Sequence, residues 1–158
     1  MPLLAPRRYD TDEAQARRLR DASDLLPEAV ILAGRARAEI GTLLPGRTVL
    51  DLAVLPEGRA ITPVPCDPAA PAAYVLTSGS TARPKVVPQT HQAILTLVAG
   101  CAGLNDLGSE DISLNWLPMD HVGSFIMLHM RDAYLGARQI RAAGADVLRD
   151  PLIWLDWM

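Results

Sequence analysis

Apolar residues occur along the chain in short runs that alternate between helical spacing and continuous, strand-like spacing. The residues from 10 to 26 carry an apolar stripe at helical spacing, and Pro27 follows it. The run 29–33 is short and continuously apolar, as in a buried parallel strand, and 35–44 returns to helical spacing before the strand-like run 48–55. This part of the chain is therefore expected to fold in the order helix, strand, helix, strand.

A proline-rich span separates these elements from a second series. Its prolines remove backbone N–H donors and disfavour regular structure, so we interpret 56–72 as a surface loop. We expect a strand at 73–76, then a loop, then a helix that begins near Thr90. The inward face of that helix is expected to hold Ile94, Leu97, Val98 and Cys101.

The same alternation continues toward the C-terminal end. Strands are predicted at 113–117 and 137–142. Between them, 122–135 is apolar nearly all round its helical projection, which indicates a helix buried on most sides. A final helix is expected from Asp150, with Pro151 in its first turn.

Strands that alternate with helices predict an α/β fold with a mostly parallel sheet flanked by helices. The sequence shows no internal repeat, low-complexity tract or composition shift that would mark a second domain. We therefore interpret residues 1–158 as a single domain that includes the proline-rich loop.

Composition and charge exclude several classes of function. The chain has 49% hydrophobic and 21% charged residues, as folded domains do, and a net charge of −3. Nucleic-acid binding needs a basic surface, so no nucleic-acid partner is expected. Apolar runs fall short of the roughly 20 residues that cross a bilayer, and the first residues do not resemble a signal peptide. We expect a cytoplasmic protein without a membrane partner.

The cysteines and histidines do not form a metal-binding pattern. Cys66 and Cys101 are far apart and lack CxxC spacing, so both are interpreted as ordinary thiols. His91, His121 and His129 lack the spacing of zinc ligands, and no metal site is expected. His129 stands in a largely apolar helical segment and is interpreted as a hydrogen-bonded core residue.

Two other groups of polar residues are first given structural interpretations. Asp120 precedes the predicted helix 122–135 and is interpreted as its cap rather than as an acid/base partner of His121. Arg131 and Asp132 are expected at the surface, solvated or ion-paired.

A GxSxG nucleophile motif is absent from the sequence, so serine hydrolysis has no support.

The segment Thr77-Ser-Gly-Ser-Thr-Ala-Arg-Pro-Lys85 is the sharpest chemical signal. Hydroxyls and backbone N–H groups donate to phosphate oxygens, glycine permits a close approach of the backbone, and lysine adds a positive charge. In α/β proteins such a loop, at the carboxyl end of a strand, is where ligands bind. The segment does not match GxxxxGK[ST], so it is not a Walker A loop. The alternative is a Ser/Thr-rich turn without a ligand.

Two segments in this order resemble a known superfamily. Tyr74-Val-Leu-Thr-Ser-Gly-Ser-Thr-Ala-Arg-Pro-Lys85 resembles the phosphate-binding signature of the adenylate-forming enzymes, which include acyl-CoA synthetases and the adenylation domains of nonribosomal peptide synthetases. Ser113-Leu-Asn-Trp-Leu-Pro-Met-Asp-His-Val-Gly-Ser124 resembles a motif of the fatty acyl-AMP ligase-like branch.

The resemblance implies an activity, a site and partners. Such enzymes use ATP with Mg²⁺ to activate a carboxylic acid, release pyrophosphate and pass the acyl group to a thiol. Here the thiol would belong to an acyl carrier protein in polyketide or nonribosomal peptide biosynthesis. His121 would lie at the acyl pocket near the reacting carboxylate, as the catalytic residue. The residues implied to contact the β- and γ-phosphates are Thr77, Ser78, Gly79, Ser80, Thr81 and Lys85.

Departures from the family pattern limit what the resemblance implies. Ala82 and Ser124 stand where the family usually has glycine, and Ser124 is expected to narrow the acyl pocket. The later motifs for adenine, ribose and the catalytic lysine of the C-terminal domain are absent from the sequence. We therefore expect a part of the large N-terminal domain that is inactive alone. The alternative is a truncated, inactive domain whose open edges serve dimerisation or docking in an assembly line.

Overall fold

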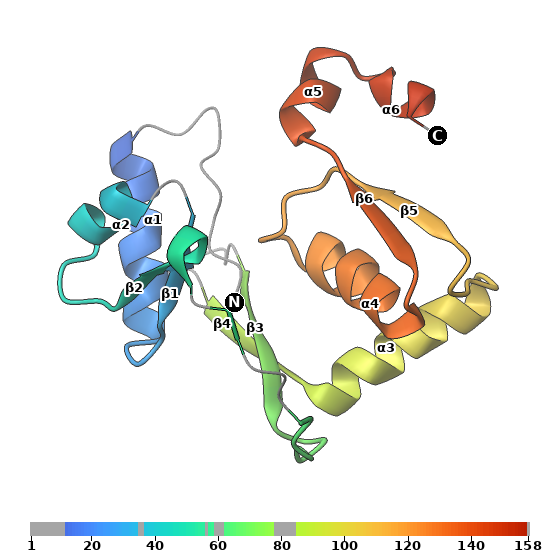
Figure 1. Cartoon of the computed structure of the whole chain (residues 1–158), viewed down its shortest axis with the longest axis horizontal. Helices are drawn as coiled ribbons and strands as arrows, with labels where there is room; N and C mark the ends of the chain where they lie inside the picture. The colour runs from blue at the N-terminus through green and yellow to red at the C-terminus, as the bar shows by residue number, and fades with distance from the viewer. Residues whose placement is uncertain (1–11, 35–36, 56, 59–61, 78–84, 158) are drawn as a thin grey trace. The chain divides into compact units, whose positions relative to one another are not determined.

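The computed structural model describes residues 12–34, 37–55, 57–58, 62–77 and 85–157 (Figure 1). They form two compact units. One unit contains the described residues up to position 66 together with 77, 85 and 86, and the other contains 67–76 and 87–157. Each unit is described below by itself.

The first unit has the predicted order of helix, strand, helix, strand. The strands pair in parallel with Ile31 opposite Val49, which confirms the expected parallel pairing. Residues 52–54, expected to belong to the second strand, form a 3₁₀ helix instead, and Leu32 is 56% exposed, so the first strand is not buried along its whole length. Buried alanines and aliphatic residues, including Ala22, Ile31 and Leu44, form its interior. Its elements are α1 (Asp12–Leu25), β1 (Ile31–Ala33), α2 (Arg37–Leu43), β2 (Val49–Asp51) and the short 3₁₀ helix η1 (Leu52–Val54).

Arg47 ties the two helices of this unit together. Its guanidinium donates to the Ser23 carbonyl oxygen at 2.9 Å, to Asp24 Oδ1 at 3.2 Å and to the Pro27 carbonyl oxygen. These acceptors lie at the end of α1, while Arg47 follows the turn after α2, where Gly46 has a φ of 85°. The turn therefore needs glycine, and the arginine donates to carbonyl groups at the end of α1, where helices lack intrahelical donors for their last carbonyls.

The second unit begins with two paired strands and a long helix. The strand predicted at 73–76 is present as part of β3. Residues 85–90, expected to belong to a loop, instead form a strand that pairs with β3. A connection as short as 78–84 can join only antiparallel neighbours, so β3 and β4 are antiparallel. The expected order of strand, loop and helix is therefore wrong, because a second strand precedes the helix. The elements are β3 (Pro71–Thr77), β4 (Lys85–Thr90) and α3 (His91–Leu104).

Helix α3 starts where the sequence predicted it. Thr90 is its N-cap, with Oγ1 accepting a hydrogen bond from the Ala93 N–H at 3.1 Å. Ile94 and Val98 are buried as expected, and Cys101 is half-buried. Leu97, also expected inside, is 42% exposed. Only one face of α3 is covered, and this buried face includes fewer of the apolar residues of the helix than the sequence pattern predicted.

The rest of the second unit is a pair of parallel strands covered by a helix. β5 pairs with β6 in parallel, with Leu114 opposite Ile140. The predicted helix 122–135 is present as a π-helical segment that continues into an α-helix (Figure 1). The elements are β5 (Ile112–Asn115), η2 (Gly123–Met130), α4 (Arg131–Leu135), β6 (Arg138–Arg141), α5 (Gly144–Arg149) and α6 (Ile153–Asp156).

The core of this unit joins β3 to helices α3 and η2. Phe125 and Met130 pack against it as half-buried side chains. Met127 and Tyr134 on η2 and α4 are exposed, so the expectation of a helix buried on most sides is wrong. The final helix is also displaced: α6 begins at Ile153, after Pro151, and α5 was not predicted. The buried residues of the core are Ala73, Val75, Ile94, Val98 and Ile126.

The two faces of the β5–β6 pair have an unusual polarity. Ser113, Asn115 and Gln139 form hydrogen bonds to residues of η2 and α4, so polar side chains face the covering helix. Because side chains alternate along a strand, the apolar residues of these strands point the other way. Ile112 is 60% exposed and Ile140 is 41% exposed on that opposite face.

Gly136 provides a test of the turn that leads into β6. It caps α4 with a φ of 68°, a conformation that costs a residue with a Cβ on the order of 1 kcal/mol. Gly136→Ala is expected to lower the free energy of unfolding by about that amount. Gly103→Ala is the control, because a Cβ there meets no described atom within 4 Å and alanine favours a helix. Urea denaturation should show opposite signs, and equal effects would contradict the role of Gly136.

Candidate functional site

The predicted phosphate loop is described only at its two ends. Ser78, Gly79, Ser80 and Thr81 lie outside the described residues, as does Ala82. Thr77 is the last residue of β3 and Lys85 is the first residue of β4, and both side chains are exposed. The hairpin therefore holds a hydroxyl and an ammonium group at the two ends of the loop, both accessible to an anionic ligand.

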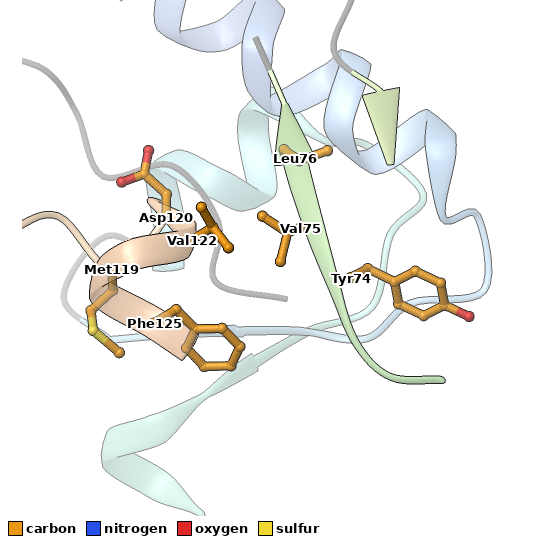
Figure 2. Close-up of a pocket in the computed structure, with 7 residues that line it drawn as sticks. All are labelled: Tyr74, Val75, Leu76, Met119, Asp120, Val122 and Phe125. Atoms are coloured by element: carbon orange, nitrogen blue, oxygen red, sulfur yellow. The ribbon is translucent and has the colours of Figure 1, made fainter. Parts of the chain in front are cut away.

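A small open pocket lies beside β3 in the second unit (Figure 2). It is a shallow depression open to solvent, and most of its described lining residues are apolar. Val75 and Val122 point toward each other across it, and Asp120 is the acidic residue among its described lining residues (Figure 2). The lining residues come from β3 and from the turn between β5 and η2 together with the first turn of η2: Tyr74, Val75, Leu76, Met119, Asp120, Val122 and Phe125.

His121 lies on the turn that forms one wall of this pocket. The described lining residues include both of its neighbours, Asp120 and Val122, but not His121, whose ring is exposed. The His121 backbone N–H donates to the Pro118 carbonyl oxygen at 3.1 Å, and its carbonyl oxygen accepts from the Phe125 N–H at 3.0 Å. The placement of His121 near a reacting carboxylate therefore stays a prediction. What the structure adds is the hydrogen-bonded turn that carries the residue.

The His121 ring has one nitrogen committed to the backbone. Its Nδ1 accepts a hydrogen bond from the Gly123 N–H at 3.1 Å, which places the proton of the neutral ring on Nε2. A Cβ at Gly123 would lie 3.2 Å from the same Nδ1, closer than side chains normally approach. Glycine at this position therefore permits the ring to fold back over the turn and leaves Nε2–H as the available donor.

Asp120 and Ser124 differ from their expected roles. The N-cap of η2 is Val122, so Asp120 is not the cap and instead lines the pocket. Ser124 is fully buried, and its hydroxyl points to Asn115 and Leu117, while the described pocket lining does not include it. The expectation that Ser124 narrows the pocket directly is therefore wrong, because its side chain faces β5.

Asp132 forms a buried polar centre that the sequence did not predict. Its carboxylate accepts from Arg131 Nη2 at 2.7 Å, from Gln139 Nε2 at 2.6 Å and from the Ser113 hydroxyl. The expected ion pair with Arg131 is present, but Asp132 is only 3% exposed, so its placement at the surface is wrong. In the sequence, only the polar residues within the strand segments β5 and β6 indicated that partners for this carboxylate could exist.

His129 is a structural residue, as predicted. Its Nδ1 lies 2.9 Å from Gln139 Oε1, and its ring stacks on Phe125 with centroids 6.2 Å apart. Since Gln139 Nε2 donates to Asp132, its Oε1 accepts the His129 proton. The histidine thus extends the Asp132 cluster and gains a hydrogen bond that a half-buried ring requires.

Three observations bear on the other predictions from the sequence. In the described part of the chain, Cys66 and Cys101 are both free thiols. The described residues contain no group of three His, Cys, Asp or Glu side chains that could hold a metal ion. Among the same residues, none of the helices has the length and apolar character needed to cross a membrane.

Comparisons with known proteins agree on one family. The family model for "AMP-binding enzyme" matches residues 3–158. The nonribosomal peptide synthetase btyA of Aspergillus terreus (strain NIH 2624 / FGSC A1156) is 40% identical over 85 residues, which are 54% of this chain and 9% of that protein. The chain thus spans about a tenth of the length of the curated relatives it matches.

Solved structures cover nearly the whole chain. The structure of McyG A-PCP complexed with phenylalanyl-adenylate has a TM-score of 0.81 and 31% identity, over 98% of this chain and 25% of that one. The adenylation domain of a keto acid-selecting module bound to keto acyl adenylate also has a TM-score of 0.81 and 31% identity, over 99% of this chain and 30% of its own.

One further structure shares the fold alone. The fatty acyl-adenylate ligase from L. pneumophila is 21% identical with a TM-score of 0.71, over 89% of this chain and 26% of that one. The α/β class and the resemblance to adenylate-forming enzymes are therefore confirmed. On the match to residues 3–158, the chain belongs to the AMP-binding enzyme family.

Proposed function

We propose that this chain provides the phosphate loop and one wall of the acid pocket in an ATP-dependent activation of a carboxylic acid. One observation carries the proposal: residues 74–76 of β3 line the pocket, and the same strand continues through Thr77 into the hydroxyl-rich loop that ends at Lys85. A single strand thus leads from the acid pocket to the phosphate site.

The chemistry assigned to the site is adenylation. An oxygen of the acid carboxylate attacks the α-phosphorus of ATP, the bond to the β-phosphate oxygen breaks, and pyrophosphate leaves with the bonding electron pair. Thr77, Lys85 and the intervening residues bind the β- and γ-phosphates and so stabilise the leaving group. Mg²⁺ bound together with ATP would supply charge neutralisation at the phosphates, and we assign no described residue of this chain as its ligand.

We place amino and keto acids ahead of fatty acids as the substrate class. The support is similarity: the phenylalanyl- and keto acyl-adenylate structures are 31% identical to this chain, against 21% for the fatty acyl-adenylate ligase. Fatty acids are the second candidate class.

The acceptor of the activated acid is proposed to be a carrier-protein thiol. That thiol attacks the acyl carbon, and AMP leaves. The support comes from the assembly-line character of the relatives: btyA is a nonribosomal peptide synthetase, and McyG was solved as an A-PCP structure. The partner of this chain would accordingly be a carrier domain of the same assembly line.

A docking module is the second candidate function. The observation that favours it is apolar exposure in the second unit, where Leu104 is 88% exposed and Ile112 is 60% exposed. Parallel strands are normally covered on both faces, so the open face of β5 and β6 is suited to a partner, either a second copy or a neighbouring assembly-line domain.

Pyrophosphate exchange separates the two functions. The chain is incubated with ATP·Mg²⁺, labelled pyrophosphate and one acid from a panel of phenylalanine, phenylpyruvate, octanoate and dodecanoate. Label entering ATP with one acid above the acid-free level supports adenylation and identifies the class. Calorimetric titrations without heat for ATP and every acid, together with a dimer by light scattering, would support docking and contradict the enzyme proposal.

A second arm of the same experiment examines His121. His121→Ala removes the Nε2–H donor, and the affinity for the preferred acid is expected to fall about tenfold, the value of one good hydrogen bond. ATP affinity should not change. His91→Ala is the matched control, since His91 is the first residue of α3. Equal acid affinities in both variants would show that His121 does not serve the pocket.

A further inference from the structure

The turn that carries His121 is closed at its base by two buried side chains. Asn115, the last residue of β5, is 1% exposed, and Ser124, the second residue of η2, is fully buried. Asn115 Nδ2 donates to Ser124 Oγ at 3.1 Å and to the Ser124 carbonyl oxygen at 3.3 Å. The two residues therefore join the ends of the segment that runs between strand and helix.

Leu117 completes the closure through its backbone. Its N–H donates to Asn115 Oδ1 at 3.1 Å, and its carbonyl oxygen accepts from the Ser124 hydroxyl at 3.0 Å. Asn115, Ser124 and Leu117 thus form a closed ring of hydrogen bonds, which we name the 115–124 clasp. Arg141 of β6 adds a bond from Nη2 to the same carbonyl oxygen at 3.2 Å.

The segment closed by the clasp contains the functional groups of the turn. Met119, Asp120 and Val122 line the pocket, and His121 carries the committed Nδ1. The residues of the clasp do not appear in the described pocket lining. They act on the pocket through the backbone of the turn and through the contact of Ser124 Oγ with Met119 Sδ at 3.6 Å. Buried polar groups with all partners satisfied specify one arrangement, and removal of one partner costs each group that it contacted one hydrogen bond in a dry environment.

We propose that Ser124 and Asn115 are positioning residues that hold the Met119–Val122 wall and the His121 ring in the arrangement required for acid binding. The proposal rests on the proposed function for its acid arm, while the closure of the turn can be measured without any ligand. Serine at 124 provides the hydroxyl that donates to Leu117. Alanine or glycine at 124 would leave both Asn115 Nδ2 and the Leu117 carbonyl oxygen without this partner.

Native-state hydrogen exchange by NMR tests the closure in the 158-residue chain. Ser124→Ala is expected to speed exchange at the Leu117 and Gly123 amides at least tenfold relative to the Val98 amide, which reports global opening from the core of α3. Ser124→Thr keeps a hydroxyl and should retain slow exchange at both amides. Ser23→Ala, a change at the buried serine of α1, is the matched control and should leave both amides unchanged.

The protonation pattern of the His121 ring provides a second measurement, which would not change if Ser124 contributed only to global stability. Nitrogen chemical shifts should show the Nε2-protonated form in the unaltered chain and a mixture of both neutral forms in Ser124→Ala. Equal acceleration at Leu117, Gly123 and Val98, with an unchanged ring, would mean that Ser124 contributes only to global stability and would overturn the proposal. Ser124→Gly serves as a second variant if the alanine variant does not fold.

Ligand titrations connect the clasp to the acid. In Ser124→Ala the dissociation constant of the preferred acid is expected to rise at least fivefold, while that of ATP stays the same. An unchanged acid affinity in a variant with rapid exchange at Gly123 would overturn the positioning role. If the unaltered chain binds none of the acids, the acid pocket itself is wrong and the positioning role falls with it, whereas the exchange data still decide whether the clasp closes the turn.

Discussion

Lys85→Ala is expected to weaken ATP binding at least tenfold and to leave AMP binding unchanged. The lysine stands at the start of β4 with an exposed side chain, at the end of the loop proposed to hold the β- and γ-phosphates. A charge-assisted hydrogen bond contributes roughly 1.5–3 kcal/mol, and about 1.4 kcal/mol corresponds to a factor of ten in affinity. AMP lacks the two outer phosphates, so its affinity should not depend on this residue. Isothermal titration with each nucleotide measures both effects.

Lysine 85 also allows a direct check, because it is the only lysine in the chain. An amine-reactive reagent followed by peptide mass spectrometry reports its accessibility without interference from other side chains. ATP·Mg²⁺ should protect it and AMP should not. Lys85→Arg retains the charge and should recover most of the ATP affinity, while Arg149→Ala removes one positive charge from α5 as a control. Equal losses for ATP and AMP, or no protection, would contradict the phosphate site.

Asp132→Ala is expected to destabilise the protein by about 3–5 kcal/mol, the cost of breaking a buried ion pair. The carboxylate is 3% exposed, and its removal leaves Arg131, Ser113 and Gln139 without their common acceptor. Because native domains are stable by only about 5–15 kcal/mol, this single change should consume a large part of the margin. Urea denaturation followed by circular dichroism gives the free energy of unfolding.

An exposed ion pair in the same chain provides the comparison. Asp146 pairs with Arg149 across one turn of α5, and both side chains are more than a third exposed. Asp146→Ala should cost less than about 1 kcal/mol, as solvated pairs do. Asp132→Asn keeps one oxygen acceptor and serves as a milder variant if Asp132→Ala does not fold. Similar losses in the free energy of unfolding for Asp132→Ala and Asp146→Ala would show that burial does not increase the contribution of the Asp132 cluster to stability.

Local patterns predicted most of the elements because burial requires a local repeat of apolar residues. The parallel pair of β1 and β2 followed from short apolar runs. The start of α3 followed from a polar residue before an apolar stripe, and Thr90 is its N-cap. These features depend on residues that are neighbours in the sequence, so the tertiary structure did not need to be known.

Strand β4 shows where local patterns fail. Its residues include Lys85 and Pro88, which are depleted in strands. The strand exists because it pairs with β3, and proline is tolerated in a strand of a two-stranded sheet, where one edge needs no partner. Pairing with another segment thus decided a strand against which Pro88 argued.

The candidate site was predicted in part. The motif resemblance indicated the turn around His121 and the loop ending at Lys85, and the structure adds the pocket formed by β3 and that turn. The roles of Asp120 and Ser124 were wrong because both depend on the direction of a side chain. A motif gives residue types in order, whereas direction depends on how η2 begins and where β5 ends.

By itself the sequence determined the family, the alternation of strands and helices, and the residue types available to bind phosphate and acid. Only the tertiary structure decided that Asp132 is buried, that Asn115 and Ser124 close the turn, and that Asp120 rather than His121 lines the pocket. The physical reason is distance along the chain. A helix or strand is specified by neighbours, but a buried polar group is stable only if partners from separate elements arrive with matching donors and acceptors.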